Sequence, residues 1–187
     1  MTNDPTEWEQ GLPDIPTDWS SWLDEYGPRL MLYARQQTRS MADAEDVMQD
    51  AVVQLVKVVE SGRFEGSASQ YVPYVLSAIR HRAADVGRRH KARYKYEQMD
   101  VEALAAGEEN PWLHSEHDDD LYRRHVERIL RRMPEEYVEI LLLKMWENLT
   151  HHQIAAVTGE AVSTVYARYR RALARFREEL AEDPLPE

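Results

Sequence analysis

Apolar residues recur at steps of three and four along most of the chain, which is the spacing of one helical face. The first such run begins near Trp19 and continues through Leu23, Leu30 and Tyr33. Pro28 lies within it, where a proline can break or kink a helix. We find no stretch with the alternation of a β-strand. The pattern therefore predicts an all-α fold.

A second apolar stripe predicts a helix of some five turns that opens at Ser40. Ser40 is a good N-cap, and Asp43 follows three positions later, where a capping box places its carboxylate. The stripe itself consists of Val47, Met48, Ala51, Val52, Leu55, Val56 and Val59. Composition predicts a loop over residues 62–70, and periodicity predicts a third helix over residues 71–89 with Pro73 in its first turn.

The most informative pattern spans residues 150–173, where two apolar helical runs meet at Thr158 and Gly159. Gly159 can take a left-handed turn without steric cost. Val165 and Tyr169 face inward in the second run, whose opposite face carries Ser163, Thr164, Tyr166, Arg168 and Arg171. A helix-turn-helix presents such a face to the DNA major groove. An ordinary helical hairpin with a solvated basic face is the alternative.

Charge and proline content divide the chain into four parts. Residues 1–18 hold Pro5, Pro13 and Pro16 among acidic residues and are expected to form an acidic mobile tail. Residues 19–95 form a first helical domain, residues 96–120 an acidic linker, and residues 121–182 a second domain. The expected architecture is two small helical domains joined by an acidic linker, the C-terminal one a helix-turn-helix.

The net charge of −11, from 23 Lys and Arg against 34 Asp and Glu, conceals two basic patches. Residues 80–95 hold seven Lys or Arg and one Asp, and residues 168–177 hold five Arg and no acid. Because electrostatic screening acts over about 8 Å at physiological salt, DNA responds to the local patch more than to the molecular total. The acidic total argues against indiscriminate DNA binding by the free protein.

Little in the sequence favours an enzyme, and no catalytic residue, cofactor or metal ligand is predicted. The chain has no cysteine, which excludes disulfides and thiolate metal sites. The apolar runs are too short to cross a bilayer and the N-terminus lacks a secretion signal, so a cytoplasmic location without membrane insertion is expected. A helical metal-dependent hydrolase built on His114, His117 and the acidic residues 118–120 remains an alternative.

Three segments resemble the sigma-seventy family of bacterial RNA polymerase sigma factors. Residues 43–51 (DAEDVMQDA) are similar to a helix of region two, and residues 74–89 to the basic helix that follows it. Residues 147–173 are similar to region four. The short linker leaves no room for a full region three, as in the extracytoplasmic-function group. The resemblance covers about residues 19–95 and 121–180.

The resemblance implies a sigma factor that binds core RNA polymerase and promoter DNA, with an anti-sigma factor as its usual regulator. The implied polymerase-binding residues are Asp43, Glu45, Asp46, Gln49 and Asp50. Those implied for the minus-ten element are Phe64, Tyr71, Tyr74, Arg80, Arg88, Arg89 and Arg93. Those implied for the minus-thirty-five element are Ser163, Thr164, Tyr166, Arg168 and Arg171. From the residues alone, Tyr71 and Tyr74 also fit the inner, core-facing side of their helix.

The chain departs from the family pattern at single positions. Tyr74 replaces a tryptophan, His81 an asparagine, Asn148 a glycine, Ala161 a serine N-cap and Tyr166 a lysine. Tyr166 on the reading face implies an altered promoter sequence. A stand-alone transcriptional regulator that uses only the helix-turn-helix is the alternative function, although it leaves the basic helix of residues 80–95 without a purpose.

Overall fold

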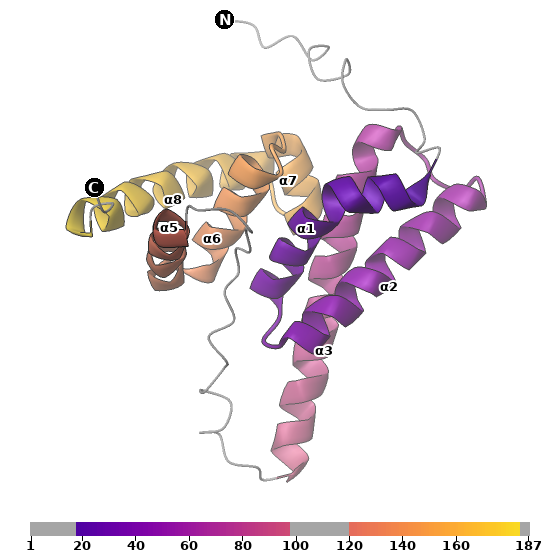
Figure 1. Cartoon of the computed structure of the whole chain (residues 1–187), viewed down its shortest axis with the longest axis horizontal. Helices are drawn as coiled ribbons and strands as arrows, with labels where there is room; N and C mark the ends of the chain where they lie inside the picture. The colour runs from indigo at the N-terminus through magenta and orange to yellow at the C-terminus, as the bar shows by residue number, and fades with distance from the viewer. Residues whose placement is uncertain (1–17, 98–119, 184–187) are drawn as a thin grey trace, which may run out of the picture.

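The computed structural model describes residues 18–97 and 120–183, with the backbone alone at 93–97 and 120–123. The N-terminal domain consists of α1 (Trp19–Gln37), α2 (Met41–Glu60), the 3-10 turn η1 (Ala68–Gln70) and α3 (Tyr71–Glu97). The C-terminal domain consists of α5 (Asp120–Arg132), α6 (Glu135–Leu141), the π-helical turn η2 (Leu142–Trp146), α7 (His151–Thr158) and α8 (Val162–Glu182). These ranges contain no strand, and the prediction of two helical domains is confirmed (Figure 1).

The first helix begins as predicted but does not break at its proline. The Asp18 carboxylate caps α1 by accepting a hydrogen bond from the Ser20 amide at 2.9 Å. The helix continues through Pro28 to Gln37. Pro28 and Asp24, whose carbonyl loses its helical partner, are both exposed. Water can therefore satisfy that carbonyl, which reduces the cost of the proline.

The second helix forms as its apolar stripe predicts, despite its many β-branched residues. Ser40 caps it, with Oγ accepting a hydrogen bond from the Asp43 amide at 3.1 Å. Val47, Ala51 and Leu55 are buried against the other helices of the domain. Since this burial outweighs a small loss in helix propensity, periodicity predicts the element better than propensity does.

The third helix is longer than the sequence predicts. It ends at Glu97 rather than near Arg89. Between Gly87 and Glu97 the sequence contains no glycine or proline. It does contain lysine, arginine and alanine, which favour helices. The side chain of Arg93 lies outside the described residues, as do the tail to residue 17, residues 98–119, and His114 and His117.

The helix-turn-helix matches its prediction closely. Thr150 and Gln153 form a capping box at the start of α7, with the Gln153 amide donating to Thr150 Oγ1 at 3.2 Å. Gly159 ends α7 in the left-handed conformation with φ of 73°. Asn148 also has a positive φ, of 50°. Asparagine is one of the few other residues that tolerate this region, which explains how it can replace the family's glycine.

The two domains pack against each other. Helix α3 lies against α7, and one cluster of buried side chains runs through both domains. Figure 1 shows the C-terminal helices beside α1 and the upper part of α3, with α8 extending away from the N-terminal domain. In the part of the chain that is described, no helix is both long and apolar enough to cross a membrane.

Candidate functional surfaces

Helix α2 carries an acidic surface on the side opposite its buried stripe. Ala44, Val47 and Ala51 anchor the helix in the core. The polar residues between them gather on the outer side, where Glu45, Asp46, Gln49 and Asp50 are exposed and Asp43 is half-buried. This surface offers hydrogen-bond acceptors and negative charge to a basic partner.

Two carboxylates of the acidic surface are tied to α3. Arg82 Nη1 lies 2.8 Å from Asp50 Oδ2, and its Nη2 donates to Gln54 Oε1 at 3.1 Å. His90 Nε2 lies 3.6 Å from Asp43 Oδ1. Sequence reasoning missed Arg82 in this role, since nothing in the local pattern places it opposite Asp50. The contact with Arg82 thus links the exposed end of this surface to α3, while the buried stripe holds the helix in the core.

An aromatic cluster stands where the loop of residues 62–70 meets α3. The Phe64 ring contacts Tyr71 and Tyr74 edge to face, with centroids 4.9 and 5.5 Å apart. Tyr71 is only 3% exposed and also contacts Trp19 at 5.9 Å. The structure thus places Tyr71 in the core, while Phe64 and Tyr74 are half-buried at the surface.

The basic residues of α3 are not all equally accessible. Arg88 and Arg89 are exposed, and Arg88 pairs with Asp85 one turn earlier. Arg80 is different, because its Nε donates to Glu139 Oε1 of the C-terminal domain at 2.9 Å. Burial alone would lower the pKa of Arg80, but the Glu139 carboxylate outweighs it and raises the pKa. The structure therefore joins Arg80 to the other domain rather than to the exposed basic surface.

The outer side of α8 carries most of the residues expected to read DNA. Val165 and Ala172 are fully buried, while Ser163, Thr164, Tyr166 and Arg171 are exposed. Arg168 differs, since its Nη2 lies 2.7 Å from Glu160 Oε1 and its side chain is largely covered. On a helix Arg168 lies between the buried positions 165 and 172, so its partial burial follows from the geometry.

His151 on α7 packs against two aromatic residues of α8, and sequence reasoning did not assign it a role. Its ring contacts Tyr166 at 5.5 Å and Tyr169 at 5.6 Å between centroids. Burial, with smaller contributions from Lys144 and His152, lowers the pKa of His151. A neutral His151 therefore packs under Tyr166, whose own side chain is 52% exposed.

Within residues 18–97 and 120–183, no group of three or more His, Asp and Glu side chains could hold a metal ion. The hydrolase alternative rested on His114 and His117, which lie outside these ranges. The described candidates are thus the acidic surface of α2, an aromatic cluster at the start of α3 with exposed arginines about four turns further along that helix, and the polar outer side of α8. Each is suited to binding a macromolecule.

Two family models match this chain. Residues 22–93 match "Sigma-70 region 2", and residues 123–176 match "Sigma-70, region 4". The matches cover α2 and α3 in the first domain and the helix-turn-helix in the second. Both candidate DNA-binding surfaces and the acidic surface therefore fall within matched residues.

Curated relatives and solved structures agree with these matches. RNA polymerase sigma factor SigV of Bacillus subtilis is 27% identical over 147 residues, covering 79% of this chain and 81% of the relative. The sigma-E factor of Streptomyces coelicolor is 28% identical over 156 residues, covering 81% and 79%. The sigma factor RpoE from Bartonella quintana, solved with the anti-sigma factor NepR, aligns with a TM-score of 0.63 and 21% identity over 89% of this chain and 98% of its own. CnrH, solved with the cytosolic domain of CnrY, aligns with a TM-score of 0.53 and 18% identity over 88% of each chain.

Proposed function

This chain belongs to the extracytoplasmic-function group of the sigma-70 family. We propose that separate surfaces of it bind core RNA polymerase, the minus-ten element and the minus-thirty-five element. The protein is a sigma factor, which binds core RNA polymerase and directs it to specific promoters. The family consists of non-enzymatic initiation factors, and we infer that this chain is not an enzyme either. Its place of action is that of the polymerase, the cytoplasm. The alternative of a stand-alone regulator is not favoured, since both domains match the family.

The acidic surface of α2 docks on core RNA polymerase. The supporting observation is that Glu45, Asp46 and Gln49 are exposed together on one side of a helix whose other side is anchored in the core. Asp43 and Asp50 border the same surface and are held by residues of α3. A rigid, negatively charged helix loses little conformational entropy when it binds a basic partner.

The N-terminal domain holds the melted minus-ten element. Arg88 and Arg89 are exposed on α3 and can contact the phosphates of a single strand. Phe64 and Tyr74 form an aromatic edge beside the loop of residues 62–70, where an unpaired base can stack. Tyr71 supports this edge from the core, and Arg80 becomes available only when Glu139 releases it.

Helix α8 reads the minus-thirty-five element in the major groove of duplex DNA. Ser163, Thr164 and Tyr166 lie in its first turns, which is where a recognition helix contacts base edges. Arg171 extends from the same side one to two turns later. The Tyr166 ring, held at its edge by His151, presents an aromatic surface where the family usually has a flexible lysine.

We assign the working domains to residues 19–95 and 121–182, with residues 1–18 and 96–120 as tail and linker. An anti-sigma factor is the proposed regulator. The support is that the sigma factor RpoE from Bartonella quintana, which has a similar fold, was solved with the anti-sigma factor NepR. CnrH, which also has a similar fold, was solved with the cytosolic domain of CnrY.

The docking proposal is tested by equilibrium binding of the fluorescently labelled full-length chain to core RNA polymerase. Asp46→Ala and Gln49→Ala are each expected to weaken binding by about 1–2 kcal/mol, as typical interface contacts do. The matched control is Glu60→Ala, an exposed carboxylate at the far end of the same helix. Unchanged affinity for both variants, with unchanged thermal unfolding, would remove α2 as the docking element.

A further inference from the structure

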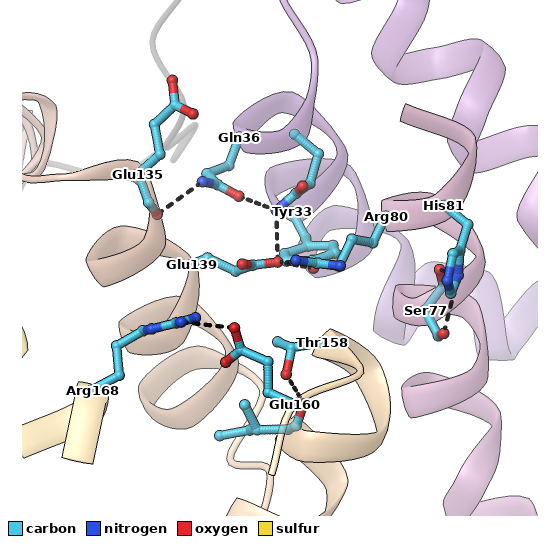
Figure 2. Close-up of polar contacts among 12 residues, drawn as sticks. Tyr33, Gln36, Ser77, Arg80, His81, Glu135, Glu139, Thr158, Glu160 and Arg168 are labelled. Atoms are coloured by element: carbon cyan, nitrogen blue, oxygen red, sulfur yellow. Dashed lines mark hydrogen bonds and ion pairs between the residues drawn. The ribbon is translucent and has the colours of Figure 1, made fainter. Parts of the chain in front are cut away.

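The seam between the two domains is organised around one carboxylate, that of Glu139 on α6. Its Oε1 accepts hydrogen bonds from Tyr33 Oη at 2.7 Å, Gln37 Nε2 at 3.0 Å and Arg80 Nε at 2.9 Å. Figure 2 shows Glu139 reaching from its helix to Tyr33 and Arg80 across the seam. Among the described residues, all three partners belong to the N-terminal domain. The side chain of Glu139 therefore stabilises the contact between the two domains rather than the C-terminal domain to which it belongs.

The environment of Glu139 makes these contacts strong. Its side chain is 9% exposed, and Tyr33 is 1% exposed. Burial raises the pKa of Tyr33 far above its ordinary value, and the nearby Glu139 adds to the effect. Tyr33 therefore keeps its proton at physiological pH and donates a hydrogen bond to Glu139. Hydrogen bonds to a charged acceptor in such a shielded place are stronger than those between neutral groups.

A second contact between the domains involves Arg29, one turn before Tyr33 on α1. Arg29 on α1 donates from Nη2 to the Trp146 carbonyl at 2.7 Å, and the same nitrogen lies 3.2 Å from Glu147 Oε2. The Glu147 side chain is buried. A buried carboxylate needs an opposite charge nearby, so separating the domains would leave Glu147 without its cation until water enters.

Two of the arginines expected to bind DNA are paired with carboxylates, Arg80 across the seam and Arg168 within the C-terminal domain. Glu139 holds Arg80 from the minus-ten set, and Glu160, beside the start of α8, holds Arg168 from the minus-thirty-five set at 2.7 Å. Burial has the largest effect on the pKa of Arg80 and lowers it, whereas Glu139 and, to a smaller extent, Glu160 raise it. Both carboxylates therefore lie near enough to Arg80 to affect its charge. Figure 2 shows both pairs side by side. Only the pair of Arg80 with Glu139 crosses between the domains, so separation of the domains would free Arg80 and leave the pair of Arg168 with Glu160 intact.

We propose that Glu139 is a latch that closes the free protein, holding Tyr33, Gln37 and Arg80 against the C-terminal domain so that Arg80 is withheld from DNA. The proposal rests on the assignment of Arg80 to the minus-ten surface. Opening releases Arg80, separates α3 from α7, and lets the two domains take independent positions. Core polymerase and promoter DNA bind the open form and must overcome the latch, so the closed population lowers their apparent affinity.

The latch is tested by the distance between the domains in the free, full-length chain. The chain lacks cysteine, so Val53→Cys on α2 and Arg177→Cys on α8 give two labelling sites at exposed positions. Single-molecule fluorescence transfer then reports the closed and open populations. Glu139→Gln removes the charge, and Tyr33→Phe removes one donor from the opposite side of the seam while keeping the ring. Glu136→Gln, an exposed carboxylate on the same helix, is the matched control.

The unaltered chain and Glu136→Gln are expected to show mainly the closed population. Glu139→Gln should raise the ratio of open to closed chains about tenfold, and Tyr33→Phe should raise it in the same direction, because each weakens a charge-assisted hydrogen bond. An open population already dominant in the unaltered chain would overturn the proposal, as would equal ratios in all four proteins. Neither polymerase nor DNA is present, so this result stands apart from the test of the sigma-factor assignment.

Discussion

At the scale of single residues, His151 shows how a partly buried side chain can support an exposed aromatic residue on a neighbouring helix. Its ring contacts those of Tyr166 and Tyr169 on α8 in T-shaped arrangements. Its Nε2 atom is buried without a hydrogen-bond partner among the described residues. A proton on this ring would place a charge in a site that already repels it through Lys144 and His152.

The lowered pKa of His151 predicts a dependence of stability on pH. Between the lowered value and the ordinary 6.5 the unfolded chain binds more protons at this site than the folded chain does, so stability rises with pH there. The contribution is fully present above 6.5 and is lost as the pH falls through the folded value. His151→Phe keeps the ring contacts and removes the titration, so the difference in free energy of unfolding between pH 5.5 and 7.5 should shrink.

Urea unfolding at the two pH values measures this difference. His152→Gln is the control, because it removes an exposed neighbour but leaves the burial that contributes most to the pKa shift. That control should retain most of the pH dependence of the unaltered chain. The same pH dependence in His151→Phe and in the unaltered chain would show that His151 does not titrate differently in the folded state.

At the scale of elements, the ends of helices are where local sequence has the most influence. Helix α8 begins at Ala161 in an extended conformation, and no side-chain hydrogen bond caps it within the described structure. Helix α2 begins at Ser40 with such a bond. A serine, threonine, aspartate or asparagine N-cap satisfies an amide that is otherwise left without a partner in the first turn.

Ala161→Ser should therefore increase the free energy of unfolding by about 1 kcal/mol, and Ser40→Ala should decrease it by about the same amount. Urea unfolding followed by circular dichroism measures both. The backbone at both positions is already extended, so neither change requires rearrangement. If Ala161→Ser left the midpoint unchanged or lowered it, the first turn of α8 would have to be satisfied in another way.

Much of the helix arrangement could be predicted from the sequence because its determinants are local. The Ser40 cap, the inward stripe of α2 and the turn at Gly159 all depend on residues within a few positions. The π-helical turn η2 and the end of α3 could not be predicted so well. Glycine and proline are the residues that most clearly mark a break in a helix. The turn η2 contains neither residue, and α3 ends at Glu97 without one.

At the scale of the whole molecule, periodicity identifies which side of each helix is buried but not which helix covers it. The contact between Tyr33 and Glu139 joins residues 106 positions apart. One clue was available, because Glu139 is the only acid within the apolar residues 137–143. An acid at an inward-facing position needs a partner when buried. The sequence alone could not identify that partner as Tyr33, Gln37 and Arg80.

The same limit applies to the candidate binding residues. Spacing correctly groups the polar residues of α2 and most of those on α8 onto outer sides. It left Tyr71 open between the core and the DNA-binding surface, and the structure places this residue in the core. It does not show that Arg80 and Arg168 are held by Glu139 and Glu160. These contacts arise from packing between elements, and only the pairing of Arg80 with Glu139 depends on how the two domains sit against each other.

The central claim is that this protein gives core RNA polymerase a promoter specificity. The most direct test is run-off transcription by bacterial core polymerase on a fragmented genomic library, with and without the purified full-length protein. We predict new, discrete start sites that share one minus-ten and one minus-thirty-five sequence and that appear only when the protein is added. Saturable binding to duplex DNA without polymerase, together with no new transcripts when polymerase is present, would contradict the claim and favour a stand-alone regulator.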